Sequence, residues 1–246
     1  MLSNIRIVLV QTFHPGNIGA SARAMKTMGL SQLTLVNPRC FPDEEATRLA
    51  AGAEDVVINA SVTNAMADAV ADCVQVIGAS ARLRNLPLPH FDEPDRMAED
   101  TITVARSEPV ALVFGRERFG LTNDELRHCT HQVSIPANPD YGILNLAQAV
   151  QVLCYELFRA QQRTQQTHTH QALPRQTPLP SQEQLAHFYE HLHRVMKDVG
   201  FLTQPHARTE EHLHALFARA QPSRKELSIL RGFLSAVEKK AQDTNP

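Results

Sequence analysis

The 246-residue sequence lacks several features by which common protein classes are recognised. It has only four cysteines and no C-x-x-C pair, which argues against a disulfide framework and for reduced, buried thiols. No apolar run approaches the roughly 20 residues of a membrane span. The first residues show no secretion signal. We therefore expect a globular protein of the cytoplasm that does not span a membrane.

Three familiar fingerprints of catalysis are also missing. The sequence has no GxxxxGK[ST], which excludes a P-loop NTPase, and no GxGxxG, which argues against a standard dinucleotide site. It has no GxSxG nucleophile elbow either. His187 and His191 stand four residues apart, but no cysteine or carboxylate completes a ligand set, so we expect a solvated polar face and no metal.

The charge is nearly balanced, at a formal net −2, but it is spread unevenly along the chain. Residues 1–160 contain 13 Lys and Arg against 18 Asp and Glu. Residues 161–246 contain 11 against 8, together with eight of the 12 histidines. The C-terminal part is thus mildly basic, which permits binding to a polyanion without requiring it.

Strand-like and helix-like segments alternate over residues 1–160. We expect strands at 5–10, 33–36, 56–58, 74–77, 110–114 and 133–135, and helices at 18–28, 43–51, 62–71 and 146–159. This alternation predicts an α/β domain with a mostly parallel sheet. The 146–159 helix is apolar enough for the core or for a subunit interface, and its pattern does not distinguish the two.

The chain changes character after this domain. Residues 161–180 are rich in Gln, Thr, His and Pro, which predicts a flexible linker. Residues 181–246 predict three helices, of which the middle one covers 209–220. Ser181 with Gln184, and Ser223 with Glu226, form capping-box pairs ahead of the other two. Such a small helical appendage is marginal alone, so we expect it to dock on the first domain or on a partner chain.

Three expected strands end in loops of small or turn-forming residues, at 78–84, 115–121 and 136–142. Ligands of open α/β sheets bind beyond the carboxyl ends of the strands, and glycine lets the backbone approach a ligand closely. Taken singly, each loop is also explained by a strand that simply ends there. Together they predict one pocket built largely from backbone groups.

Three motifs occur in order along the chain: Asn17–Ala24 (NIGASARA), Phe114–Glu117 with Gly120-Leu121, and Leu144–Val150 (LNLAQAV). They resemble the three signature motifs of the SPOUT methyltransferases, in the branch that methylates ribose 2′-hydroxyls. The sequence is most similar to the bacterial tRNA (cytidine/uridine-32-2′-O)-methyltransferases. The run ELSILRG at 226–232 resembles the tail of that group, so the resemblance covers nearly the whole chain.

The resemblance implies a trefoil knot in the C-terminal part of the α/β domain, a homodimer, transfer RNA as substrate and S-adenosylmethionine as methyl donor. A sulfonium is already a good donor, so no metal is required. By resemblance, the residues in contact with the cofactor are Ala79, Ser80, Ala81, Gly115, Ile135, Gly142, Ile143 and Leu144.

By resemblance Arg23 is the catalytic residue, next to the ribose 2′-hydroxyl, and Asn17 orients the substrate or the backbone. A guanidinium with a pKa above about 12 is a poor base, so we interpret Arg23 first as a positioner and electrostatic stabiliser. Glu117 is expected to brace its loop or to pair with an arginine. The third motif departs from the family, because 141–143 reads Tyr-Gly-Ile where a serine usually precedes Leu-Asn. A serine hydroxyl can have no role there, whereas backbone contacts would survive.

Several cationic side chains lie on the rims of the same loops. Fork-shaped guanidinium groups suit RNA phosphates, although solvated loop charge explains these residues equally well. His14 either contacts RNA or stabilises a turn. The predicted RNA-binding residues are Arg82, Arg84, Arg116 and Arg118.

The expected function is thus 2′-O-methylation at position 32 of the tRNA anticodon loop. One alternative is methylation of another tRNA site or of ribosomal RNA. A second is an RNA-binding protein that keeps the fold without catalysis, against which the presence of Arg23 and Asn17 argues. A third is a small-molecule methyltransferase, which would leave the basic appendage unexplained.

Overall fold

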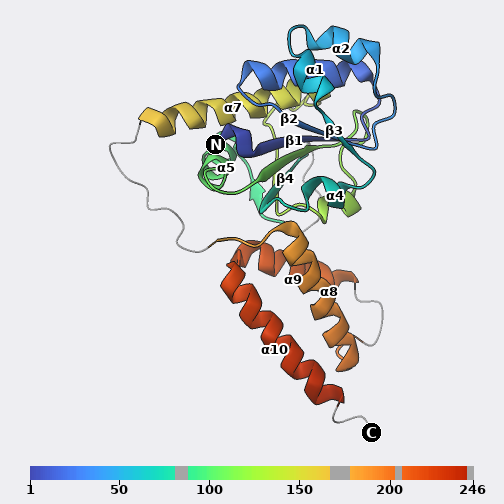
Figure 1. Ribbon diagram of the computed structural model, residues 1–246, viewed down its shortest axis with the longest axis vertical. Coiled ribbons are helices and arrows are strands. Elements are labelled where there is room, and N and C mark those ends of the chain that lie inside the picture. Colours follow the sequence, from blue (N-terminus) through green and yellow to red (C-terminus); the bar gives the residue numbers. More distant parts are fainter. Residues whose placement is uncertain (81–87, 167–177, 203–206, 243–246) are drawn as a thin grey trace. The chain divides into compact units, whose positions relative to one another are not determined.

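The computed structural model describes residues 1–80, 88–166, 178–202 and 207–242 (Figure 1). These residues form two compact units. Among the described residues, the first comprises 1–80 and 90–166, and the second comprises 88–89 together with 178–202 and 207–242, which include helices α8, α9 and α10. Each unit is described by itself below.

The first unit is built on a seven-stranded sheet in the order β3-β2-β1-β6-β4-β7-β5, and every neighbouring pair is parallel. The central strands β1 and β6 are rich in Val, Ile and Leu and almost fully buried, as strands of a parallel sheet covered on both faces must be. The strands are β1 Ile5–Val10, β2 Gln32–Val36, β3 Ser61–Thr63, β4 Gln75–Ala79, β5 His90–Phe91, β6 Val110–Phe114 and β7 His131–Val133.

Helices cover both faces of the sheet: Figure 1 shows α1, α2 and α7 on one side and α4 on the other. Helix α1 packs against both α2 and α7. Gly19 permits the close approach of α1 to α2, because a Cβ there would overlap the carbonyl oxygen of Ala46. The helices are η1 Leu2–Asn4, α1 Pro15–Thr27, α2 Glu44–Ala50, α3 Glu54–Ile58, α4 Met66–Val70, α5 Pro94–Val104, α6 Asn123–Leu126 and α7 Leu146–Gln166.

The structure corrects three expected elements. The strand expected at 133–135 lies two residues earlier, as β7 at His131–Val133. The segment 56–58, expected as a strand, belongs to helix α3, whose first turn carries Glu54 and Asp55, where negative charge interacts favourably with the helix dipole. Both Val56 and Val57 are buried in that helix. The helix expected at 62–71 divides into the edge strand β3 and the short helix α4.

Other elements were not expected from the sequence. Strand β5 is only two residues long and α6 only four, so neither has a recognisable period. Helix α5 has a proline in its first turn, and its buried Met97, Ala98 and Ile102 carry a helical signal that was present in the sequence. Helix α7 continues to Gln166, six residues into the segment expected as a linker, because Gln and Arg are good helix formers.

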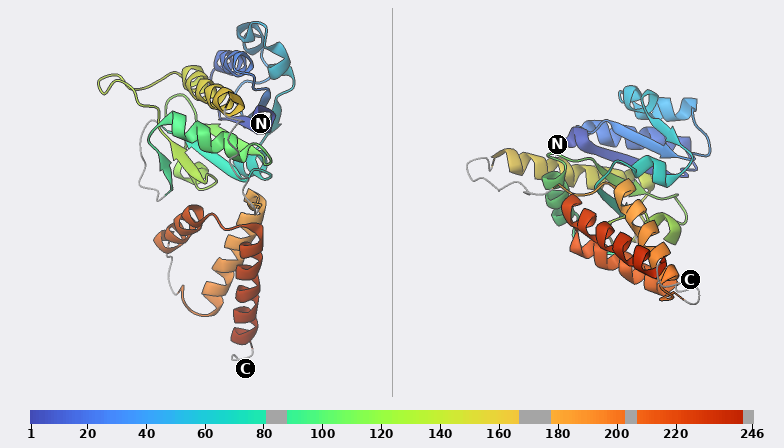
Figure 2. Two further views of the ribbon diagram at one scale, coloured as in Figure 1. Left: turned by 90° about the vertical axis from the view of Figure 1, so that its left-hand side faces the viewer. Right: turned by 60° about the horizontal axis from the view of Figure 1, so that its bottom comes forward.

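The second unit is a three-helix assembly of α8 Gln182–Asp198, α9 Ala207–Ala220 and α10 Arg224–Gln242. Figure 2 shows α8 and α10 side by side, and their core contains Phe188, Val195, Leu227 and Leu234. The Phe188 ring also meets Phe217 of α9 edge-on, at 4.8 Å between centroids. Both predicted capping boxes are present.

The expected fold class is therefore confirmed: a parallel α/β sheet followed by a small helical unit. The strand pairing does not test the trefoil knot, which stays a prediction. Across the described ranges of the chain, no helix is long and apolar enough to cross a membrane.

Candidate active site

The three loops singled out from the sequence leave the sheet side by side. Strands β6, β4 and β7 are consecutive in the sheet, and Ala79 at the end of β4 is paired with Phe114 on one side and Val133 on the other. The Ser80 amide donates to the carbonyl of Val133 at 3.0 Å, which extends this pairing by one residue. The carboxyl ends of all three strands therefore lie next to one another at the same end of the sheet.

The loop after β6 folds back tightly on itself. The Gly120 amide donates to the Arg116 carbonyl at 2.9 Å, and Gly120 has a φ of +64°, in the region that favours glycine. Gly115 is buried, and a Cβ there would overlap the backbone of Gly120 and Leu121. This loop therefore requires glycine at 115 for its own closure.

The loop before α7 presents main-chain donors. Its turn is closed by Asn138, whose carbonyl accepts from the Tyr141 amide at 3.1 Å. Within the described ranges, the next three amides, of Gly142, Ile143 and Leu144, have no acceptor. The Ile143 side chain is 68% exposed. An apolar surface next to unused N–H groups suits a flat, polar-edged ligand such as a nucleobase.

The Asn17 side chain links the three motifs. Its Nδ2 donates to Glu117 Oε1 at 2.8 Å, and its Oδ1 accepts from Asn145 Nδ2 at 3.0 Å. Asn17 lies in the first turn of α1, Glu117 in the loop after β6, and Asn145 directly before α7. One chain of hydrogen bonds thus joins Asn17 to segments 100 and 128 residues away in the sequence.

Glu117 also holds the segment that leads into α1. Its carboxylate accepts from the backbone amides of Phe13 and His14, at 3.0 and 3.1 Å. Partial burial opposes ionisation, but these bonds and the one from Asn17 outweigh it and keep the pKa of Glu117 below its usual range. The expectation that Glu117 braces its loop agrees with these contacts, and its partners are amides rather than an arginine.

Arg23 lies on the exposed surface of α1, six residues after Asn17. Its carbonyl accepts from the Thr27 hydroxyl at 2.7 Å. No described residue forms a hydrogen bond or ion pair with its guanidinium group. The cation is therefore available to a bound ligand.

The arginines predicted on the loop rims differ in their surroundings. Arg116 is only 17% exposed, and its guanidinium donates to Glu125 at 2.6 Å, to the Gly120 carbonyl at 3.0 Å and to Gln11 at 3.2 Å. These contacts make Arg116 a brace of its own loop, while Arg118 is exposed. Ala81, Arg82 and Arg84 lie outside the described residues.

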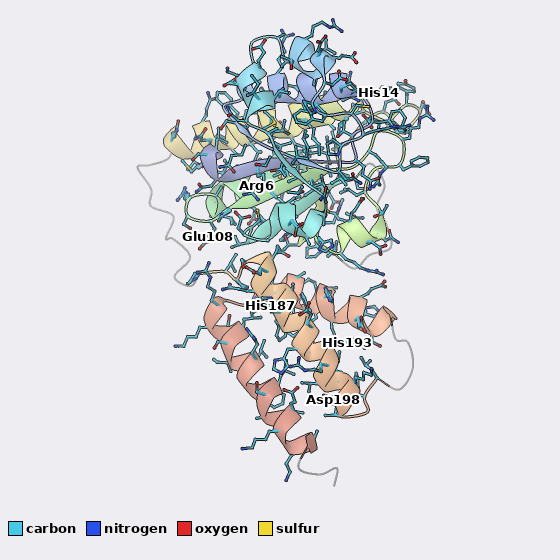
Figure 3. The ribbon with its side chains drawn as sticks, turned by 45° about the vertical axis from the view of Figure 1, so that its right-hand side comes forward. Arg6, His14, Glu108, His187, His193 and Asp198 are labelled. Atoms are coloured by element: carbon cyan, nitrogen blue, oxygen red, sulfur yellow. The ribbon has the colours of Figure 1, made fainter. Side chains whose placement is uncertain are left out.

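Sequence reasoning missed a groove of about 600 Å³ beside this network. It lies where β1, β2 and β6 end. Figure 3 labels His14 at this end of β1 and Arg6 near the other end of the strand. The spacing of residues along the chain gave no signal for the groove, because three strands contribute to it. Its lining residues are Gln11, Phe13, His14, Asn37, Pro38, Arg39, Arg116, Glu117, Arg118 and Phe119.

Comparison with known proteins identifies the family. Residues 4–155 match the SpoU rRNA Methylase family, and residues 183–246 match the tRNA methyltransferase TrmJ, C-terminal domain. The tRNA (cytidine/uridine-2′-O-)-methyltransferase TrmJ of Yersinia pestis (strain Pestoides F) is 49% identical over 247 aligned positions, which cover all of this chain and 95% of that protein. The chain belongs to the TrmJ family of SpoU methylases.

Two solved structures match this chain over nearly its whole length. TrmJ from Z. mobilis ZM4 has a TM-score of 0.79 at 32% identity, and covers 95% of this chain and 98% of its own. A probable methylase family protein from Haemophilus influenzae Rd KW20 is 46% identical with a TM-score of 0.66, and all of both chains is covered. The resemblance drawn from the three motifs is thus confirmed.

Proposed function

We propose that this TrmJ-family protein transfers a methyl group from S-adenosylmethionine to the ribose 2′-hydroxyl of cytidine or uridine 32 in the tRNA anticodon loop. The observation that carries the proposal is the Glu117–Asn17–Asn145 chain of hydrogen bonds, in which Asn17 ties all three motifs together. The Yersinia pestis relative is named a tRNA (cytidine/uridine-2′-O-)-methyltransferase. Position 32 rests on the resemblance of the sequence.

The three loop exits fit the proposed methyl donor. The unused amides of Gly142, Ile143 and Leu144 suit the adenine and ribose, and the exposed Ile143 side chain suits an adenine face. Bound there, S-adenosylmethionine would supply an activated methyl group on its sulfonium. The described residues proposed to hold it are Ala79, Ser80, Gly115, Ile135, Gly142, Ile143 and Leu144, and Ala81 completes the set.

Arg23 is proposed to act on the ribose. Its exposed guanidinium would position the 2′-hydroxyl and stabilise the negative charge that develops on the oxygen as the proton leaves. A guanidinium remains protonated in proteins and is a poor proton acceptor, so solvent takes the proton in this scheme. Asn17 is proposed to keep α1 in register with the cofactor loops, so that the hydroxyl and the methyl group are aligned.

Binding of the RNA is proposed to involve both units. Arg82, Arg84 and Arg118 would contact RNA phosphates, whereas Arg116, predicted from the sequence to do so, would hold the loop that carries Arg118 through its bonds to Glu125 and Gly120. The mildly basic helices α8 to α10 would add electrostatic attraction. We further propose a cytoplasmic homodimer, which sedimentation analysis would show as twice the 27.4 kDa mass of the chain. A monomer at micromolar concentration would contradict it.

The decisive experiment is methylation of unmodified tRNA by the purified protein. Nuclease mapping with mass spectrometry should find one added methyl group on the ribose of nucleotide 32, only when S-adenosylmethionine is present. Methylation mapped to another nucleotide would support a different RNA site. Binding of tRNA without any methylation would support a non-catalytic protein of the same fold.

A further inference from the structure

The groove beside the motif network is lined by both aromatic and cationic side chains. Phe13 is 47% exposed and Phe119 is 73% exposed, both large for phenylalanine in a folded protein. Arg39 and Arg118 are exposed at the same groove. Neither Phe13 nor Arg39 belongs to the three motifs or to the proposed cofactor site.

Phe13 and Arg39 form a flat surface in this groove. The Arg39 guanidinium lies over the Phe13 ring, with its central carbon 4.0 Å from the ring centroid, in cation–π geometry. The His14 ring meets Phe13 edge-on at 5.2 Å. The Arg39 amide donates to the Thr12 carbonyl at 3.1 Å, so the two strand exits are joined by their backbones as well.

The groove is held in place by the motif network, through Glu117. Glu117 accepts from the backbone amides of Phe13 and His14, so the carboxylate bound to Asn17 also holds the backbone that carries the Phe13 ring. Two non-glycine residues that line the groove have left-handed backbones, Gln11 with a φ of 49° and Asn37 with a φ of 46°. Such conformations are uncommon and persist where the surrounding structure enforces them.

The charge of the groove favours an anionic occupant. Among the described residues that line it, Glu117 is the one carboxylate, and its oxygens are occupied by Asn17 and two amides. Arg39 and Arg118 leave an excess of positive charge. Aromatic faces next to guanidinium groups are the pattern by which proteins bind unpaired nucleotides, with the base stacked and the phosphate near a cation.

We propose that the Phe13–Arg39 groove binds the base of an unpaired nucleotide next to the methylated one, and so helps to present the target ribose to Arg23. This inference rests on the proposed function, because it takes the ligand to be an RNA loop. The groove would act as a positioning and affinity site, separate from the site of the methyl donor.

The test compares Phe13→Leu and Arg39→Lys with the wild type in binding to an anticodon stem-loop RNA. Loss of a stacking ring should weaken binding about 5- to 100-fold. Arg39→Lys keeps the charge but loses the flat guanidinium, so we expect about a 2- to 5-fold loss. Phe13→Tyr keeps the ring and should bind as the wild type does.

Abasic RNAs identify the stacked base directly. Each nucleotide beside the target is replaced in turn by an abasic one. At one of these positions, the wild type should bind the abasic RNA about as weakly as Phe13→Leu binds the intact RNA. At that same position, Phe13→Leu should bind the abasic RNA almost as well as it binds the intact RNA. Equal losses by both proteins at every position, or unchanged affinity in Phe13→Leu, would overturn the groove assignment.

Matched controls separate local from general effects. Ile58→Ala removes an apolar side chain that is 74% exposed on α3, and Arg48→Ala removes an arginine whose side chain is 71% exposed on α2. Both should bind RNA as the wild type does. If the wild type methylates tRNA while Phe13→Leu matches it in affinity, this inference fails and the proposed function stands. If no tRNA is methylated but Phe13→Leu still weakens RNA binding, the proposed function fails and the groove stands.

Discussion

At the scale of single residues, two side chains in the site have opposite surroundings. Glu117 is saturated with hydrogen bonds from Asn17 and two backbone amides. The Arg23 side chain forms no hydrogen bond or ion pair within the described ranges and is exposed. Substitution of the first should therefore affect stability and activity together, and substitution of the second should affect activity alone.

Arg23→Ala should lower the methylation rate about 10²- to 10³-fold, as the loss of one preorganised donor to a developing oxyanion does elsewhere. The free energy of unfolding should change by no more than about 0.5 kcal/mol, because the side chain is exposed. Single-turnover methylation and denaturant unfolding measure the two effects. Arg48→Ala is the control, and a rate for Arg23→Ala equal to that of the control would contradict the role proposed for Arg23.

Glu117→Gln should destabilise the first unit by about 1–2 kcal/mol near neutral pH, because bonds to a charged acceptor are lost or weakened. The folded pKa of Glu117 is lowered, so the stability that its ionised form contributes is fully present above about pH 5. That contribution is lost as the pH falls from there through the lowered folded value. The difference between wild type and variant should therefore shrink in acid, as denaturant unfolding at pH 7, 5 and 4 would show.

The exposed Glu44 of α2 offers a comparison for this pH series. Glu44→Gln should give a small difference from the wild type at all three pH values. A difference for Glu117→Gln that stayed constant or grew on acidification would mean that the carboxylate is not stabilised by the amides.

At the scale of elements, the loop after β6 depends on one glycine. Gly115→Ala would push a Cβ into the backbone of Gly120 and Leu121, which belong to the same tight turn. We expect a loss of about 1–3 kcal/mol from overpacking, together with weaker binding of S-adenosylmethionine, because the turn must open beside the loops proposed to hold the cofactor. Thermal unfolding and calorimetry with the cofactor measure both effects.

Gly232 in α10 provides the opposite case for the same substitution. A Cβ there would meet nothing within 4 Å, and the residue is inside a helix. Gly232→Ala should therefore stabilise the second unit by about 0.5–1 kcal/mol, by lowering the entropy of the unfolded chain and raising helix propensity. A destabilised Gly232→Ala variant, or an unaffected Gly115→Ala variant, would contradict this account of the glycines.

At the scale of the whole molecule, the basic helices are proposed to add attraction for RNA. Lys225 and Arg231 are exposed on α10. Replacing both by alanine should weaken tRNA binding and reduce the slope of log K against log salt by about 0.7–0.9 for each phosphate that is no longer neutralised. Filter binding over a salt range of about 50 to 200 mM would measure this slope. An unchanged slope would show that α10 binds no phosphate through these residues.

The expectations from sequence succeeded where a pattern was long. The strands expected at 5–10 and 110–114 have the same bounds as β1 and β6, and the capping boxes at Ser181 and Ser223 are present. They failed where elements are short, at 56–58, 62–71 and 133–135, because three to five residues do not display a period. Arg116 illustrates a second limit, which is that the sequence does not show which charged residues pair. Its partner Glu125 is recognisable in the sequence only as part of a helix cap.

The sequence by itself determined the fold class, the family and the three segments from which the site is built, because hydrophobic periods and motifs are local properties of a chain. Only the tertiary structure decided which of those residues meet: that Glu117 bonds Asn17, that Arg116 is committed to Glu125, and that Phe13 lies beneath Arg39. The physical reason is that parallel strands adjacent in the sheet are distant in the chain. Contacts at their carboxyl ends therefore depend on strand order, which no local pattern records.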